Sequence, residues 1–82
     1  MNPMTERRQK LLNRLEQNPK AVTIRELETT LRAFGWYLDR QKGSHKVYRH
    51  ATVTHSLVVP ERRPHVGQHY VEQVISQLRI QL

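Results

Sequence analysis

The chain contains no cysteine, so neither a disulfide nor a thiolate metal ligand can form, which fits a reducing compartment. Long apolar runs are also missing. The longest purely aliphatic stretch, residues 57–59, is far too short to cross a membrane. The first residues include arginines but no apolar segment, so we expect no secretory signal. These absences together predict a cytoplasmic protein without a membrane anchor.

Acidic residues are scarce as well. Seven Asp and Glu stand against fourteen Lys and Arg, which gives the chain a net charge of +7. A basic surface attracts polyanions, and Lys or Arg contacts with phosphates release counterions. The charge therefore favours a nucleic-acid partner. An acidic protein partner, or a basic domain with neither role, would show the same excess of positive charge.

Helical periodicity occurs towards both ends of the chain. Apolar residues recur at helical spacing over residues 5–17, over residues 23–34 and again after Gly67. The clearest start signal is in the second of these segments. There, Thr23 and Glu26 match the capping-box pattern, in which two side chains satisfy free backbone donors at a helix start. We therefore predict three helices, two before residue 35 and one at the end.

Between the helices the pattern becomes that of β-strands. Aromatic and β-branched residues predict strands over residues 36–41, 44–50 and 53–59, and Gly43 supplies a turn between the first two. The order ααβββα predicts an α+β two-layer sandwich. A three-stranded antiparallel sheet would carry helices on one face, and its other face would be at least partly open. With 82 residues, we expect a single domain.

A dense group of cations and histidines surrounds the expected turn at Gly43. Histidine suits acid–base chemistry near neutrality, because a free imidazole titrates at about pH 6.5. RNA carries its own nucleophile, the 2′-hydroxyl, so an enzyme needs only to move two protons and neutralise one phosphate. His45 is then the candidate catalyst, although it could instead simply cap the turn, and the sequence offers no second acid–base group. The candidate RNA contacts are Arg40, Lys42, Ser44, Lys46 and Arg49.

The strand register is not determined by the sequence. Alternation along the second strand places residues 45, 47 and 49 on one face and residues 46, 48 and 50 on the other. Both sets contain an apolar side chain, Val47 in the first and Tyr48 in the second, so either could face the helices. A β-bulge would also change the assignment. The face that carries His45 is therefore left open at this point.

The five histidines also raise the question of a metal site. Residues 45, 50 and 55 are spaced by five, which scatters their side chains over both faces of the strands. His65 and His69 come closest to a helical pair, but they straddle the expected start of the last helix. Ser44 lies beside His45 in the chain, whereas hydrolase triads are assembled from distant positions. We therefore expect no metal, no cofactor and no serine-hydrolase chemistry.

Two short segments resemble a known family. The sequence LRAFGW at residues 31–36, followed by RQKGSH at residues 40–45, is similar to the HicA toxin family. Members of that family have a helix that ends in Gly-aromatic, then a strand, then Gly-Ser-His opening the second strand. The similarity continues through residues 47–50, residues 58–60 and the final helix.

The resemblance implies one domain over residues 1–82, in which residues 1–18 form an additional N-terminal helix and residues 19–82 the HicA-like core. It implies a fold like the double-stranded RNA-binding domain and a toxin that cleaves mRNA as an endoribonuclease, with His45 as the functional histidine. It also implies a HicB-type antitoxin as partner in a hetero-oligomer. Two features depart from the family: Lys46 stands where many members have a second histidine, and residues 61–68 differ from the usual approach to the last helix. A non-catalytic RNA-binding module with the same fold is the alternative.

Overall fold

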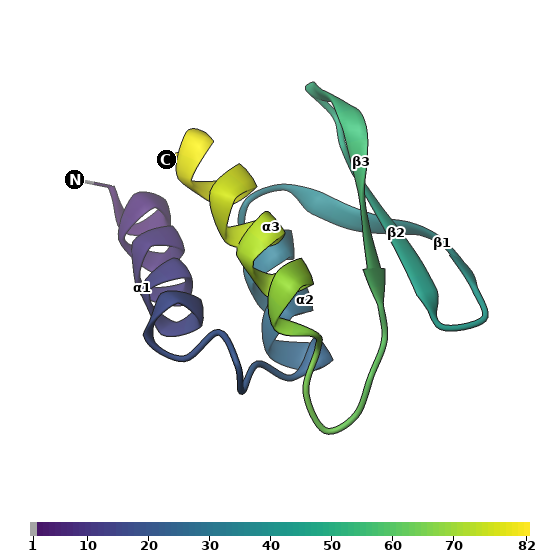
Figure 1. The fold of residues 1–82 in the computed structure, drawn as a ribbon. Helices are drawn as coiled ribbons and strands as arrows, with labels where there is room; N and C mark the ends of the chain where they lie inside the picture. The colour runs from purple at the N-terminus through teal and green to yellow at the C-terminus, as the bar shows by residue number, and fades with distance from the viewer. Residues whose placement is uncertain (1) are drawn as a thin grey trace.

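The computed structural model describes residues 2–82, which form an α+β structure in the order ααβββα (Figure 1). The predicted fold class is confirmed. None of the helices formed by these residues has the length and apolar character needed to span a bilayer. The helices are α1 (Pro3–Gln17), α2 (Ile24–Ala33) and α3 (Gln68–Ile80), and the strands are β1 (Trp36–Lys42), β2 (His45–His50) and β3 (Val53–Pro60).

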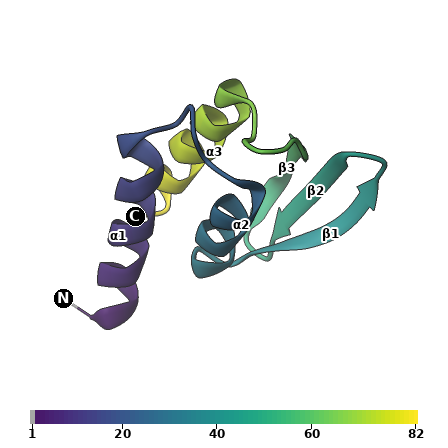
Figure 2. The same ribbon diagram turned by 90° about the horizontal axis from the view of Figure 1, so that it is seen from below.

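The three strands form one antiparallel sheet in the order β1-β2-β3. Helix α2 packs against β1 and helix α3 against β3, while α1 packs on α2 and α3 (Figure 2). Figure 2 shows α1 at the end of the molecule farthest from the sheet. One face of the sheet is therefore covered by α2 and α3, and the other face is open.

Local signals in the sequence explain how α2 starts and ends. The Thr23 hydroxyl accepts a hydrogen bond from the Glu26 backbone N–H at 3.1 Å, and the Glu26 carboxylate accepts one from the Thr23 N–H at 3.4 Å. The predicted capping box is thus confirmed. Gly35 follows the helix with φ +92°, and a Cβ atom there would lie 2.7 Å from Nε2 of His50. Only glycine satisfies both the backbone angle and this close contact.

The core lies between the helices and the covered face of the sheet. Trp36 is 1% exposed, and its indole N–H donates to Oε1 of Gln81 at 2.7 Å. That bond satisfies the one polar atom of the ring inside an apolar environment. Fully buried partners come from every helix and from the strands, namely Leu12, Leu15, Leu27, Leu31, Phe34, Val59, Val71, Val74 and Leu78.

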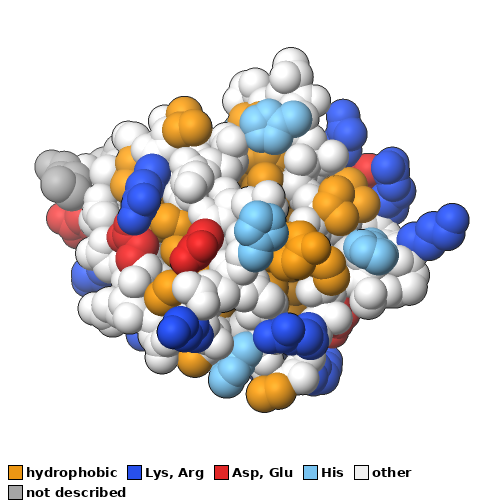
Figure 3. All heavy atoms as spheres, in the orientation of Figure 1, with side chains coloured by type: hydrophobic (Ala, Val, Ile, Leu, Met, Phe, Trp, Pro, Cys, Tyr) orange, Lys and Arg blue, Asp and Glu red, His pale blue; other side chains and the backbone are white. Residues whose placement is uncertain are grey.

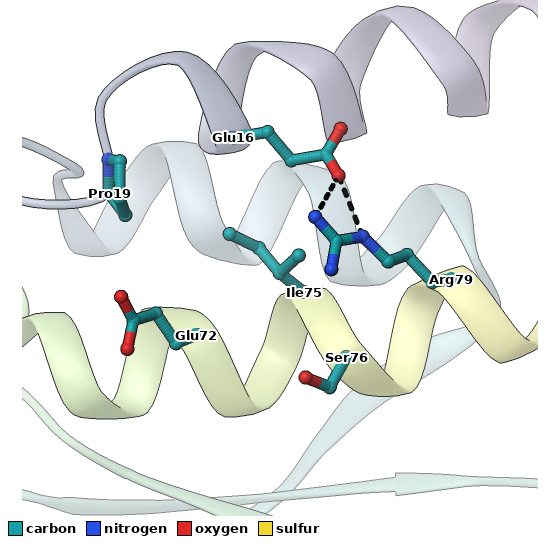
Figure 4. Close-up of a pocket in the computed structure, with 6 residues that line it drawn as sticks. All are labelled: Glu16, Pro19, Glu72, Ile75, Ser76 and Arg79. Atoms are coloured by element: carbon teal, nitrogen blue, oxygen red, sulfur yellow. Dashed lines mark hydrogen bonds and ion pairs between the residues drawn. The ribbon is translucent and has the colours of Figure 1, made fainter.

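Helix α1 starts at Pro3, two residues before the predicted position, because the Asn2 side chain accepts the Thr5 backbone N–H at 2.9 Å. An ion pair between Glu16 and Arg79 joins the C-terminal half of α1 to α3 (Figure 4). Both Nε and Nη2 of Arg79 donate to the same Glu16 oxygen, at 2.8 Å and 2.6 Å. Figure 4 shows this pair reaching across a shallow pocket whose floor includes Ile75.

We expect Arg79→Gln to lower the free energy of unfolding by only about 0.5–1 kcal/mol. The Arg79 side chain is 60% exposed, so water and salt screen its attraction to Glu16. Urea unfolding at low and at high salt measures the effect, and the difference between the two proteins should shrink as salt is added. A loss that does not depend on salt would mean that Arg79 acts through packing rather than through charge.

Candidate functional site

The β1–β2 turn is held at the end of the sheet. Gly43 has φ +58°, a left-handed conformation that suits glycine, and Lys42 and His45 are the last paired residues on either side of it. The Ser44 carbonyl accepts a 2.7 Å hydrogen bond from the Glu61 backbone N–H, just beyond β3. The turn is therefore anchored to the neighbouring strand.

Contacts with α2 decide which face of β2 is covered. Tyr48 belongs to the core, and the Lys46 ammonium contacts Glu28 on α2, so both side chains point towards the helices. Side chains alternate along a strand, and the residues between them therefore point the other way. His45, Val47 and Arg49 lie on the open face of the sheet.

The pairing of β1 with β2 brings further cations to the open face. Lys42 is the cross-strand partner of His45, and Arg40 is the partner of Val47. The register shifts between Leu38 and Arg40, a bulge that turns Arg40 away from the helices, although Leu38 two residues earlier is paired with Tyr48. Four of the six predicted site residues thus share the open face: Arg40, Lys42, His45 and Arg49.

These side chains are accessible to a large ligand. His45 is exposed, and within residues 2–82 its ring makes no hydrogen bond. The Arg40 side chain is 70% exposed and makes only a 3.7 Å contact with Asp39. Figure 3 shows Lys and Arg side chains gathered along the edge of the molecule that the strands form in Figure 1. The open face therefore combines one exposed imidazole with solvent-exposed positive charge.

Lys46 lies on the other face of the same strand. Its ammonium is 2.8 Å from a Glu28 oxygen and 3.7 Å from Glu61, and its side chain is 12% exposed. The Tyr48 hydroxyl donates to the same Glu28 oxygen at 2.6 Å. Lys46 is thus already paired with carboxylates, on the opposite side of the sheet from His45. Ser44 is exposed in the turn itself.

Comparison with known proteins bears on the whole segment from α2 to α3. Residues 24–80 match the sequence pattern of a family described as the HicA toxin of bacterial toxin-antitoxin systems. This is more than half of the chain. The chain belongs to the HicA toxin family. No curated protein and no solved structure matches it significantly.

Membership of the HicA family gives this protein the role of a toxin in a bacterial toxin–antitoxin pair and implies an antitoxin as its partner. The matched segment contains the entire sheet, including the turn with His45. Helix α1 lies outside the matched residues.

Two carboxylates of this HicA protein were missed by the sequence reasoning, Glu28 and Glu61. Burial by itself would raise the pKa of the Glu28 carboxyl, but hydrogen bonds from Lys46 and Tyr48, together with the Lys46 charge, bring it below its ordinary value of 4.5. Burial, and then the bond to Glu28, raises the pKa of Tyr48 far above its usual range. Once the strand register is known, Lys46 is seen to face the helices, where its largely buried ammonium group needs a carboxylate partner. The sequence alone carries no such signal.

The chemistry that the open face of the sheet supports follows from the positions of its side chains. His45 can accept or donate one proton, and the three cations on the same face, of which Lys42 is its cross-strand partner, can neutralise phosphates. Glu28 and Glu61, the carboxylates that Lys46 contacts, lie on the helix side and are engaged there. Within residues 2–82, no three His, Cys, Asp or Glu side chains lie close enough together to hold a metal ion.

Proposed function

We propose that this toxin is a metal-independent endoribonuclease that cleaves mRNA in the cytoplasm, with His45 as its acid–base catalyst. One observation supports the proposal above all: the exposed His45 imidazole lies on the open face of the sheet, across from Lys42, and Arg40 and Arg49 lie further along the same face. A polyanion attracted to these cations would bring its backbone to the imidazole.

In the proposed reaction, a neutral ring nitrogen of His45 takes the proton of an RNA 2′-hydroxyl. The 2′-oxygen then attacks the adjacent phosphorus, the bond to the 5′-oxygen of the next nucleotide breaks, and that oxygen takes a proton from water. The products are a 2′,3′-cyclic phosphate and a free 5′-hydroxyl. Arg40, Lys42 and Arg49 would offset the charge that develops on the phosphate. Ser44 supports the turn, and Lys46 would bind a phosphate only by leaving Glu28.

The proposed partner is a HicB-type antitoxin that covers the open face. Tyr37 and Val58, 51% and 43% exposed, lie among the cations of that face. A mixture of apolar and positively charged side chains suits a protein partner that carries acidic residues. Such an antitoxin would shield His45 and silence the toxin.

A second candidate function is RNA binding without cleavage. It is favoured by the finding that, within residues 2–82, His45 is the one histidine that the strands place on the open face, since His50 and His55 contact the helix side. Ribonuclease chemistry moves two protons, one from the attacking and one to the leaving oxygen. With one histidine, the second proton has to be exchanged with water.

Incubating the purified toxin with a long single-stranded RNA in EDTA separates these functions. We expect fragments with 2′,3′-cyclic phosphate and 5′-hydroxyl ends, because the proposed reaction uses the 2′-hydroxyl and no metal. Intact RNA with retarded mobility would favour the binding module. RNA that is neither cleaved nor retarded would favour a protein that only binds an acidic protein partner. Growth arrest on expression, relieved by the co-expressed antitoxin, tests the biological role.

A further inference from the structure

A groove of about 860 Å³ lies on the helix side of the sheet, beside the hairpin turn. One wall is the side of α2 that carries Arg25, Glu28 and Arg32, which are three and four residues apart and so share one side of the helix. The other wall combines Lys46 of β2 with Glu61 and Arg63 from the segment after β3. We call the groove between these two walls the arginine groove.

The charges in the arginine groove do not cancel. Four cations and two carboxylates line it, which leaves an excess of two positive charges. Glu28 is engaged by Lys46 and Tyr48, and Glu61 makes longer contacts, at 3.7 Å with Lys46, 3.5 Å with Arg63 and 3.4 Å with the Gln41 amide. Within residues 2–82, neither Arg25 nor Arg32 forms an ion pair or a side-chain hydrogen bond. Their guanidinium groups are therefore available to a ligand, although the charge of Arg32 also attracts the Glu28 carboxylate without direct contact.

The arginine groove adjoins the proposed catalytic turn. Glu61, at its rim, donates its backbone N–H to the Ser44 carbonyl, and Lys46 follows His45 directly in the chain. His45 and the groove therefore lie on opposite faces of the sheet at the same end of it. An RNA chain with one phosphate at His45 can pass around this end and enter the groove with its neighbouring nucleotides.

We propose that the arginine groove is a second RNA subsite, in which Arg25 and Arg32 bind phosphates that flank the cleaved one and Arg63 guides the strand at the rim. The planar guanidinium presents paired donors that match phosphate oxygens, and it stays charged at every physiological pH. Arg63 has an 83% exposed side chain and can turn towards a bound strand. This subsite rests on the proposed function, because it requires RNA as the substrate.

The test measures single-stranded RNA affinity against salt concentration, in a His45→Ala background that leaves the RNA uncut. Arg25→Gln/Arg32→Gln removes two groove charges. Arg7→Gln/Arg14→Gln removes two charges from exposed positions of α1 and is the matched control. We expect the groove pair to weaken binding about 25-fold at 0.1 M salt and to reduce the slope of log affinity against log salt by about 1.4, the value for two single-strand phosphate contacts. The control pair should change both quantities far less.

Each other outcome overturns a stated part of the proposal. If the groove pair and the control pair weaken RNA affinity equally, the groove contributes only general electrostatic attraction. If the groove variant binds RNA normally, the groove is not an RNA subsite. In both cases the proposed function would stand. Normal RNA binding with weakened antitoxin binding would assign the groove to the partner instead. If the toxin with an intact groove binds no RNA, the proposed function and the subsite fail together. Circular dichroism checks that all variants keep their helices.

Discussion

Replacing His45 with alanine is expected to slow RNA cleavage by about 10²–10⁴-fold, the usual contribution of a positioned acid–base group. RNA affinity should change little, because Arg40, Lys42 and Arg49 stay on the open face. Stability should also be retained, since the exposed His45 ring makes no hydrogen bond within residues 2–82. The rate of fragment formation in EDTA, with affinity measured alongside, separates a chemical defect from a binding defect.

His69→Ala is the matched control for the His45 substitution. It removes an imidazole from an exposed position on α3, where its hydrogen-bond partner is Gln73 of the same helix. We expect this variant to cleave RNA at the rate of the unaltered toxin. Equal activity in the His45 and His69 variants would rule out the catalytic role of His45. Loss of both cleavage and RNA binding in the His45 variant would instead make His45 a substrate contact.

Replacing Glu28 with alanine is expected to lower the free energy of unfolding by about 2–3 kcal/mol. The substitution removes the acceptor of two hydrogen bonds, from the Lys46 ammonium and from the Tyr48 hydroxyl. It also leaves a lysine whose side chain is 12% exposed without its nearest counter-charge. Urea unfolding at neutral pH measures the loss.

Two comparisons identify the cause of this instability. In Glu28→Leu/Lys46→Met no charge is left unpaired, so we expect much of the lost stability to return. The pH dependence gives an independent check. The pKa of Glu28 is lower in the folded than in the unfolded chain, so its contribution is present above pH 4.5 and is lost as the pH falls below that value. Glu28→Gln should therefore lose less stability in acid than the unaltered protein does. A double variant as unstable as Glu28→Ala would point to lost packing rather than to charge.

The order of helices and strands could be predicted because its signals are local. The capping box at Thr23 and Glu26, the glycine after α2 and the β-branched residues of β3 each act within a few positions of the chain. The start of α1 was predicted two residues too late. Its start at Pro3 depends on the Asn2 side chain, a cap that periodicity of apolar residues does not reveal.

The candidate site was likewise predicted only in part. The residue types around Gly43 indicated a phosphate-binding turn with an imidazole, and the similarity to HicA toxins in residues 31–36 and 40–45 agrees with the family match over residues 24–80. The sequence did not show which of those side chains lie on the same face of the sheet. The cations Arg40 and Lys46 looked equivalent in sequence, yet the bulge near Asp39 turns the first to the open face, while Glu28 holds the second on the other.

The sequence by itself determined the order of elements, the turn at Gly43, the excess of positive charge and the family, because each depends on residue types and on spacing along the chain. Only the tertiary structure decided which side of β2 is covered, which cations accompany His45 and that Lys46 is paired with Glu28. The physical reason is that a strand alternates with a period of two. A single bulge reverses every side chain beyond it, and the helix contacts that decide which face is covered join residues far apart in the sequence.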